Sequence, residues 1–380
     1  MRRIYLDANA YSPQVKEARD KLISCLDLFG NPSSFHADGR ATRAILDEAR
    51  DHLANAFGTN DKSIIFTSGA SEANRLFVDL LLSYASSERK IKVLISPFEH
   101  PSLMKYLLTN AEKNKGLEVC FLSIDEAGIF LDPKKAADAD VIICTSAHSE
   151  TGIIPGLLDL IDQVRDNCLI MSDVTQSISR TLEKPHQRID VLSCSSQKMG
   201  GYSGAGALVL RGNALKIFNK SPWVGGGQER GFRPGTENFL AIAAFGAAAS
   251  VIERSRALNE DLKIIRDHLE ALALKVFPKA EIVGLMAPRL KNTSAICFKG
   301  ADGEALRIGC DLSGLSVGFG YACSGLAPEE SFALKSLGIF GEDQKKTVRF
   351  SLSHINTFDD IEEATKRVAS ILRSSDFFYI

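Results

Sequence analysis

Lys198 lies between a short apolar run and a glycine-rich stretch. Lys198 ends the segment Ser193–Lys198, directly after the apolar pair Val191-Leu192, and glycines at 200, 201, 204 and 206 follow it. Small hydroxyl residues before the lysine and bare backbone after it leave room for a bulky ligand at the amine. A lysine amine whose pKa is lowered by burial suits a Schiff base with an aldehyde. Taken alone, the segment fits a solvated loop lysine better.

A second candidate lies where an apolar run gives way to a helical pattern. Gly69 permits a turn there, and Ala70 and Ser71 open the helical stretch. The free N–H groups at a helix start attract anions, and phosphate suits them best. The alternative is an ordinary cap, in which Ser68 or Ser71 serves only the helix.

Three further polar side chains follow other apolar runs. His100 could stack on a planar ring, Asp173 could hold a protonated pyridine nitrogen, and Gln176 could reach a ring oxygen. Each of these residues alone is explained more simply as a structural residue or a helix cap. Together with Lys198 and the anion site, they match what pyridoxal 5′-phosphate needs: a phosphate anchor, a ring clamp, a nitrogen partner and a lysine for the aldehyde.

The elements that must position these residues are short apolar runs separated by helical stretches. Continuously apolar runs are typical of strands in a sheet that is covered on both faces. Ligands of an open α/β sheet collect outside the carboxyl ends of its strands, where the candidates fall. We therefore predict an α/β fold with a mostly parallel central sheet. The predicted strands are Ile64–Thr67, Val93–Ser96, Val119–Leu122, Val141–Cys144, Leu169–Ser172, Val191–Ser193 and Ala207–Arg211.

The pattern of alternating apolar runs and helical stretches changes after about residue 253. A charged amphipathic helix over 258–276 leads into shorter strands, and a closing helix is expected over about 359–372. We predict a large cofactor-binding α/β domain at 13–253. Residues 1–12 and 254–380 would form a smaller α+β domain.

Composition narrows the class of protein. Of the 380 residues 45% are hydrophobic and 24% charged, as in an ordinary soluble globular protein, and a net charge of −2 argues against nucleic acid as a partner. Asp7 comes too early for a signal peptide, and the apolar stretch 239–252 is too short to span a bilayer. The eight cysteines include no CxxC pair, so we expect reduced thiols, a cytoplasmic location, and neither a membrane nor a metal site.

At this point the chain resembles the class V aminotransferase-fold enzymes, and specifically the cysteine desulfurases. The resemblance covers nearly the whole chain and implies the fold of type I pyridoxal-phosphate transferases. The segments that carry it are Tyr5–Asp7, Gly30–Ser34, Thr67–Glu72, Glu99-His100, Glu150–Gly152, Asp173–Ser177, the Lys198 segment, Arg233–Asn238, Ala322–Ser324 and Val348–Ser351.

The resemblance implies a role for each candidate. Lys198 carries the covalent link to the cofactor aldehyde, and Arg349 grips the substrate carboxylate with a fork well shaped for it. Thr236 reaches the phosphate from the partner subunit of a homodimer. The remaining cofactor contacts would be Asp173 to the ring nitrogen, Gln176 to the phenolic oxygen, His100 on the ring face, and Ala70, Ser71 and Ser195 to the phosphate.

The resemblance also implies that Cys323 is the nucleophile. It lies on the glycine-rich loop 318–325, where its thiolate would take the substrate sulfur and become a persulfide. The alternative is a small buried residue like the other seven cysteines, and the setting among glycines and prolines favours the functional interpretation.

The chain departs from the family in places. Where typical members have Asn-Asn-Glu this chain has His148-Ser149-Glu150, and Gln197 replaces a histidine before the lysine. Residues 9–12 and Tyr321 differ as well. We expect Ser149 and Gln197 still to line the cofactor site, with consequences for turnover and substrate choice.

The leading hypothesis is a homodimeric pyridoxal-phosphate enzyme that converts L-cysteine to L-alanine and passes persulfide sulfur to an acceptor, such as an iron–sulfur scaffold. One alternative is a selenocysteine lyase or another class V enzyme, whose turnover would not depend on Cys323. The other is a degenerate, non-catalytic paralogue that serves as a partner protein.

Overall fold

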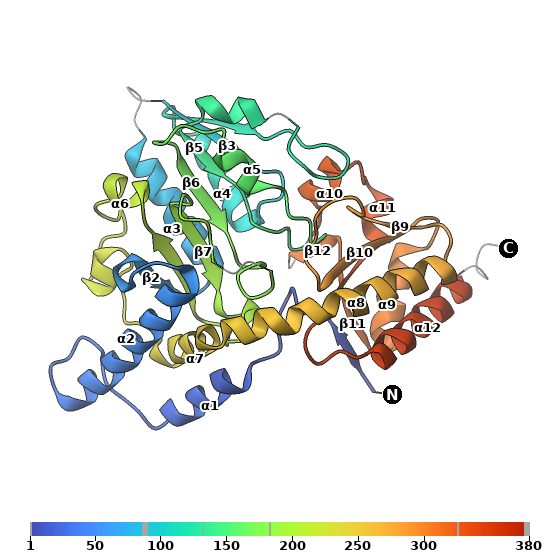
Figure 1. Ribbon diagram of the computed structural model, residues 1–380, viewed down its shortest axis with the longest axis horizontal. Helices are drawn as coiled ribbons and strands as arrows, with labels where there is room; N and C mark the ends of the chain where they lie inside the picture. The colour runs from blue at the N-terminus through green and yellow to red at the C-terminus, as the bar shows by residue number, and fades with distance from the viewer. Residues whose placement is uncertain (1, 86–89, 132, 182–183, 325–326, 376–380) are drawn as a thin grey trace.

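The chain builds two sheets that lie next to each other (Figure 1). The computed structural model describes residues 2–85, 90–131, 133–181, 184–324 and 327–375. The larger sheet comes from residues 64–210, and the smaller one joins residues 4–6 to strands between 280 and 351. The predicted domain boundary near residue 253 stays a prediction.

The larger sheet has seven strands in the order β2-β8-β7-β6-β5-β3-β4. Strands β7, β6, β5, β3 and β4 are parallel, whereas β8 runs antiparallel to both of its neighbours. The predicted mostly parallel α/β sheet is therefore confirmed. The strands are β2 (Ile64–Thr67), β3 (Ile91–Ile95), β4 (Leu117–Phe121), β5 (Val141–Ile143), β6 (Leu169–Asp173), β7 (Val191–Ser195) and β8 (Gly206–Leu210).

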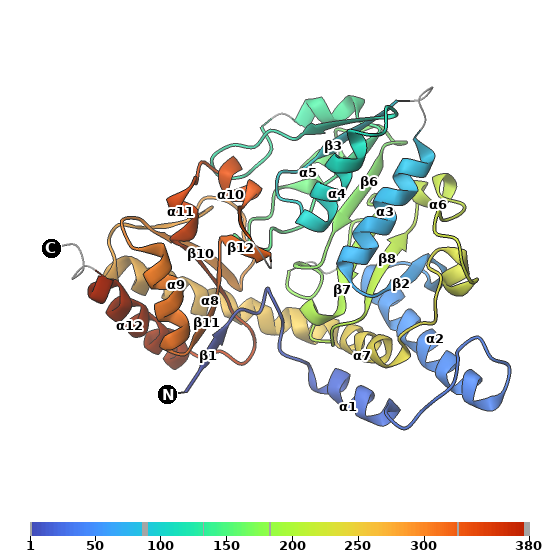
Figure 2. The same ribbon diagram turned by 180° about the vertical axis from the view of Figure 1, so that it is seen from behind.

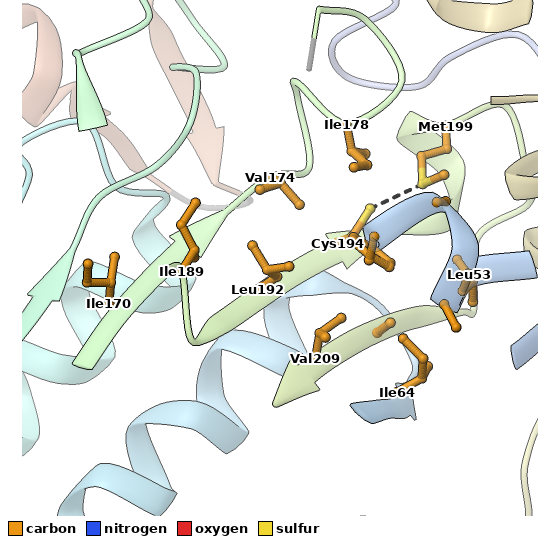
Figure 3. Close-up of a cluster of buried hydrophobic side chains, with 14 of the residues drawn as sticks. Leu53, Ile64, Ile170, Val174, Ile178, Ile189, Leu192, Cys194, Met199 and Val209 are labelled. Carbon is orange, nitrogen blue, oxygen red and sulfur yellow. Dashed lines mark hydrogen bonds between the residues drawn. The ribbon is translucent and has the colours of Figure 1, made fainter. Parts of the chain in front are cut away.

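Helices cover both faces of this sheet, which is why its strands are continuously apolar. Figure 2 shows α3 and α4 over one face, where Phe77 and Leu107 pack on the strands. The other face packs beneath α2, α5 and α7 and includes Cys194 beside Met199 (Figure 3). The helices of this part are α1 (Lys16–Cys25), α2 (Ala37–Phe57), α3 (Ala70–Tyr84), α4 (Pro101–Ala111), α5 (Leu157–Ile161), α6 (Asn213–Ile217) and α7 (Phe239–Ser250).

The smaller sheet has five strands in the order β1-β11-β14-β10-β9. Among the described strands, β1 and β11 pair in parallel and the other pairs are antiparallel, and a single parallel bridge joins Asp7 to Ser351 of β14. A separate hairpin follows β11, formed by β12 (Tyr321–Ser324) and β13 (Ala327–Glu330). The strands are β1 (Ile4–Leu6), β9 (Ala280–Ile282), β10 (Thr293–Phe298), β11 (Leu315–Phe319) and β14 (Thr347–Ser351).

Long helices pack on the smaller sheet and form its core with Phe298 and Phe350. The predicted helix at 258–276 begins earlier, because α8 follows α7 directly after Val251. The helices are α8 (Ile252–Val276), α9 (Gly303–Leu312), α10 (Phe332–Ser336), α11 (Glu342–Lys345) and α12 (Phe358–Ser375). Among the described helices, none is both long and apolar enough to cross a membrane.

The N-terminal segment links the two sheets. After β1 it runs across to the larger sheet, where the Ser12 amide donates to the carbonyl of Gln197 at 3.0 Å and the Val15 amide to that of Gly200 at 2.9 Å. We call residues 7–12 the strap. Because the strap leaves the small sheet and ends beside Lys198, it becomes one wall of the site described next.

Candidate active site

A cavity of about 1050 Å³ opens between the two sheets, at the carboxyl ends of β6 and β7. Its walls come from the strap, the start of α3, the segment before α4, the ends of β6 and β7, and from β11 and β14. It is the place where an open α/β sheet presents its ligands. The predicted residues that line it are Ala70, Ser71, His100, Ser149, Asp173, Gln176, Ser195, Gln197, Lys198 and Arg349.

Lys198 projects from a tight connection between two antiparallel strands. A short 3-10 helix (Ser196–Lys198) joins β7 to the turn before β8, and the lysine Nζ donates a hydrogen bond to the carbonyl of Ala10. Burial lowers the pKa of Lys198 to about 8, with the positive charges of Arg349 and Arg180 acting in the same direction. The amine is therefore partly neutral near neutral pH, which a nucleophile requires.

Asp173 ends β6 as a buried carboxylate, 6% exposed. Its Oδ2 accepts from Asn74 Nδ2 at 3.0 Å and its Oδ1 from the Thr175 amide at 2.9 Å, so the side chain is fixed. Among the described residues, Asn74 Oδ1 and Thr175 Oγ1 are buried without a hydrogen-bond partner. A fixed carboxylate that faces the cavity fits a protonated ring nitrogen.

The start of α3 offers main-chain donors to the cavity. The N-cap residue is Gly69, and no side chain caps this end, so the predicted alternative of an ordinary serine cap is wrong. Gly206 on β8 packs directly against this turn. A Cβ at residue 206 would lie 2.5 Å from the Cα of Gly69, so close packing requires a glycine there. Free amides at the start of a 15-residue helix fit a phosphate group.

Two polar side chains before Lys198 face the same region. The Ser195 hydroxyl donates to Gln197 Oε1, and both residues line the cavity. Gln197 thus accepts from the Ser195 hydroxyl, which lies 3.7 Å from where a Cβ on Gly69 would be, although Gln197 replaces a histidine of the family pattern.

His100 caps α4 and lines the cavity at the same time. Its Nδ1 accepts from the Ser102 amide at 3.1 Å and lies 2.8 Å from the Ser102 hydroxyl. Burial in the cavity wall lowers the pKa of His100; the charge of Lys198 also lowers it, and that of Asp173 raises it. A neutral imidazole held by its Nδ1 suits contact with a flat ring, and the stacking itself stays a prediction.

Gln176 is held from both ends of its amide. Nε2 donates to the carbonyl of Asn9 at 3.1 Å, and Oε1 accepts from Arg180 Nη1 at 2.7 Å. The donor end therefore faces the strap and the cavity, and one of its two hydrogens is already used.

Arg349 lies on β14 with its guanidinium in the cavity wall. Nη2 pairs with Asp7 at 2.6 Å and Nη1 donates to the carbonyl of Ser149 at 3.1 Å. Nε is buried and has no hydrogen-bond partner among the described residues. Gly318 makes room for the group, because a Cβ there would lie 2.6 Å from Nη2.

Three predicted residues stand apart from these contacts. Ser149 contributes its main-chain carbonyl, which accepts from Arg349 and from Asn9, whereas a side-chain contact to a cofactor stays a prediction. Thr236 is exposed and does not line the cavity of its own chain. Cys323 lies on β12 with its main chain opposite Pro328, and its side chain lies outside the described part of the structure.

Sequence reasoning missed several residues of the site. The strap residues Asn9 and Ala10 contact Ser149 and Lys198, and Arg180 holds Gln176. Asn9 and Ala10 were noted only as part of a stretch that departs from the family pattern, and Arg180 only lay near Gln176, because their contacts depend on the tertiary fold.

Comparisons with known proteins agree with this geometry. The profile of the aminotransferase class-V family matches residues 4–363. A cysteine desulfurase of Cereibacter sphaeroides is 34% identical, covering 95% of this chain and 94% of the relative. Cysteine desulfurase IscS 1 of Archaeoglobus fulgidus is 31% identical, covering 92% of each chain.

The chain belongs to the cysteine desulfurases of the class V aminotransferase family. A solved NifS-like protein of Rickettsia africae is 27% identical with a TM-score of 0.82, covering 97% of this chain and 99% of that one. The fold is shared as well with the cysteine desulfurase of Thermococcus onnurineus, at a TM-score of 0.84, 20% identity, and 98% and 95% coverage. The predicted fold class and family are therefore confirmed.

Proposed function

We propose that this cysteine desulfurase family member removes sulfur from L-cysteine with pyridoxal 5′-phosphate, releases L-alanine, and passes the sulfur on through Cys323. The observation that carries the proposal is the sharing of one cavity by the half-buried Lys198 amine, the fixed Asp173 carboxylate and the Arg349 guanidinium. No single one of these groups would suffice.

The residues present fit the cofactor. Lys198 would hold its aldehyde, Asp173 its ring nitrogen, His100 its ring face and the start of α3 its phosphate. The unpartnered buried atoms Asn74 Oδ1 and Thr175 Oγ1 lie beside Asp173, as expected where a ligand completes the hydrogen bonding. When bound, the cofactor supplies an electron sink that weakens the bonds at the substrate α-carbon.

The chain's own groups orient the substrate and move its protons. Arg349 is held by Asp7 and the Ser149 carbonyl, and its guanidinium in the cavity wall would bind the substrate carboxylate. Lys198, with a pKa of about 8, can accept a proton at Nζ from the α-carbon and return it.

Sulfur transfer would then use the thiolate of Cys323. A new S–S bond forms between Cys323 Sγ and the substrate sulfur while the Cβ–S bond breaks. The bonding electron pair stays on Cβ, which takes up a proton. Cysteine and one protein thiol thus become alanine and one protein persulfide, with no outside oxidant or reductant.

Two partners belong to the proposal: a sulfur acceptor, such as an iron–sulfur scaffold protein, and a second copy of the chain. Exposed apolar side chains on the segments before α2 and after α6, Phe29, Phe35 and Val224, favour self-association there. Thr236 of the partner subunit would complete the phosphate site. Sedimentation of the purified chain tests this, and a monomer with full activity would refute it. The seven described cysteines are all free, as expected for the proposed cytoplasmic location.

Absorption spectroscopy tests the cofactor and the substrate together. Purified protein should carry a visible absorption band that is lost in Lys198→Ala, and cysteine should change the band and release alanine. Protein that takes up no cofactor would favour the non-catalytic paralogue instead.

The variant Cys323→Ser separates the remaining candidates. A desulfurase loses persulfide formation and nearly all of its alanine release in this variant. Alanine release at the wild-type rate would instead support a selenocysteine lyase or another class V enzyme.

A further inference from the structure

A buried cation lies directly behind the cavity. Arg180 follows β6 and is 3% exposed, and its guanidinium donates hydrogen bonds to uncharged oxygens. Nη1 donates to Gln176 Oε1 at 2.7 Å and to the Gln176 carbonyl at 2.8 Å, and Nη2 donates to the carbonyl of Ala8 at 3.2 Å.

Within the described residues, the charge of Arg180 lacks the carboxylate partner that the buried Arg50 has. Arg50 pairs with both carboxylate oxygens of Glu229, at 2.7 and 3.0 Å. For Arg180, by contrast, burial lowers the pKa first, and among the described residues the charge of Arg349 also lowers it while Cys194 raises it. Burying an unpaired cation is costly, so its presence beside a ligand cavity indicates a use for the positive charge.

The contacts of Arg180 lead to two walls of the cavity. Through Gln176 Oε1 it decides which end of that amide is the donor, so Nε2 must face the Asn9 carbonyl. Through the Ala8 carbonyl it ties down the strap, and two residues further on the Ala10 carbonyl accepts from the Lys198 amine.

We propose that Arg180 is a positioning residue, which orients the Gln176 amide and sets an uncompensated positive charge behind the Lys198 amine so that this amine stays neutral enough to capture the cofactor. The inference rests on the proposed function, in which Lys198 is the residue that binds the cofactor aldehyde. The effect of the Arg180 charge on the protonation of Lys198 can be measured in the protein without cofactor.

Several charges face Lys198 from different elements. Arg349 on β14 and Arg180 after β6 favour the neutral amine, whereas Asp7 in the strap and Asp173 at the end of β6 favour the ammonium. His100, before α4, also feels this amine, because the charge of Lys198 lowers the pKa of His100. Removing the charge of Arg180 leaves Arg349 alone against two carboxylates, so the Lys198 amine should hold its proton to higher pH.

The test measures the protonation of Lys198 in the full chain freed of cofactor. Reductive methylation at a series of pH values, followed by mass spectrometry of the Lys198 peptide, gives the midpoint at which the amine becomes reactive. The wild-type midpoint should lie at about 8. In Arg180→Gln and Arg180→Met it should rise, by on the order of one pH unit, because the charge of Arg180 lowers the pKa of Lys198 and its removal lets the amine hold its proton to higher pH.

Two controls separate charge from structure. Arg180→Lys keeps the charge and should keep the midpoint. Arg211→Gln removes another buried guanidinium that donates to main-chain carbonyls, at the far end of the sheet, and should lower stability without moving the midpoint. Arg180→Gln can still donate to Gln176 Oε1, so it keeps the test available if Arg180→Met fails to fold.

A second readout follows capture of the cofactor. At pH about 7.5 the rate at which free pyridoxal 5′-phosphate is taken up should fall roughly tenfold in Arg180→Gln, because one pKa unit changes the neutral fraction about tenfold. An unchanged midpoint in Arg180→Gln overturns the proposal, as does an equal shift in Arg211→Gln. Failure of the proposed function would show itself separately, as a wild-type chain that takes up no cofactor while its midpoint is still measurable.

Discussion

The two ends of the larger sheet carry the same residue types and use them differently. At one end Asp190 precedes β7 and Arg211 follows β8; at the other Asp173 ends β6 and Arg180 follows it. Asp190 accepts from the amides of Ile170 at 3.0 Å and Asn213 at 2.7 Å and pairs with Arg188 at 2.9 Å.

The two ends differ in whether their buried polar groups have hydrogen-bond partners. Near Asp190 the buried groups find protein partners, and Arg211 donates to the carbonyls of Ile189 and Phe57. Around Asp173 and Arg349, buried polar atoms in the described part of the chain have no partner, and a cavity of about 1050 Å³ faces them. Buried aspartates and arginines alone therefore do not indicate a site; unmatched hydrogen-bonding capacity beside a cavity does.

The largest expected effect separates the two aspartates. Asp173→Asn removes the charge opposite the proposed ring nitrogen and should lower kcat by roughly 100-fold or more, the loss typical of removing a well-placed electrostatic group. Its thermal midpoint should fall by a few degrees, because one of the two N–H donors that Asp173 now accepts from would face the amide NH2. Steady-state alanine release and a thermal melt measure both quantities.

Asp190→Asn is the matched control for that prediction. It weakens the pair with Arg188 and an acceptor of two amides, so the melting temperature should fall while kcat stays near the wild-type value. If Asp190→Asn cost as much activity as Asp173→Asn, the contrast between the ends would be wrong.

A smaller effect is expected where glycine admits the carboxylate-binding arginine. Gly318→Ala places a methyl group 2.6 Å from Arg349 Nη2 and must displace the guanidinium. The KM for cysteine should rise roughly tenfold or more, the cost of a misplaced binding group, with a smaller change in kcat.

Its counterpart at the other end is Gly212→Ala, whose methyl group would lie 2.5 Å from Asp190 Oδ1 at a position with φ of 53°. This variant should lose stability and keep its KM. A wild-type KM in Gly318→Ala would show that Arg349 does not bind the substrate carboxylate.

Acid sensitivity compares two histidines. Burial, then the charges of Arg349 and His100, lower the pKa of His148 to about 3, whereas the exposed His186 lies at the opposite end of the sheet. Between pH about 6.5 and about 3 the unfolded chain binds a proton at His148 that the folded chain refuses, so stability falls as the pH falls, by up to about 1.4 kcal/mol per pH unit.

His148→Gln should remove this contribution to the dependence of unfolding free energy on pH, and His186→Gln should leave it unchanged. Urea titrations at several pH values measure the slope directly. Equal slopes in the wild type and in His148→Gln would mean that His148 is protonated in the fold.

The smallest effect is expected at Ser149. Its visible contribution is a main-chain carbonyl shared by Asn9 and Arg349, which Ser149→Ala leaves intact. Activity should change less than about threefold, within the range of substitutions that remove no buried partner. A large loss would show that the hydroxyl itself contacts substrate or cofactor.

The sequence predicted most of the larger sheet because buried parallel strands leave an unmistakable apolar run. It placed Asp173 and Lys198 correctly at strand ends for the same reason. It could not predict the ion pair of Asp7 with Arg349, or the grip of Arg180 on Gln176 and Ala8. These contacts join residues from separate elements, and no local periodicity encodes them.

The strap also sets the moment at which the protein can begin to work during its synthesis. Residues 64–210 are contiguous and can form their sheet as they leave the ribosome, since domains fold as units while the chain grows. The strand at residues 4–6 must wait for its neighbour at 315–319, and Asp7 for Arg349. A half-made chain therefore lacks part of the cavity wall, and we expect the proposed sulfur removal to await an almost complete chain.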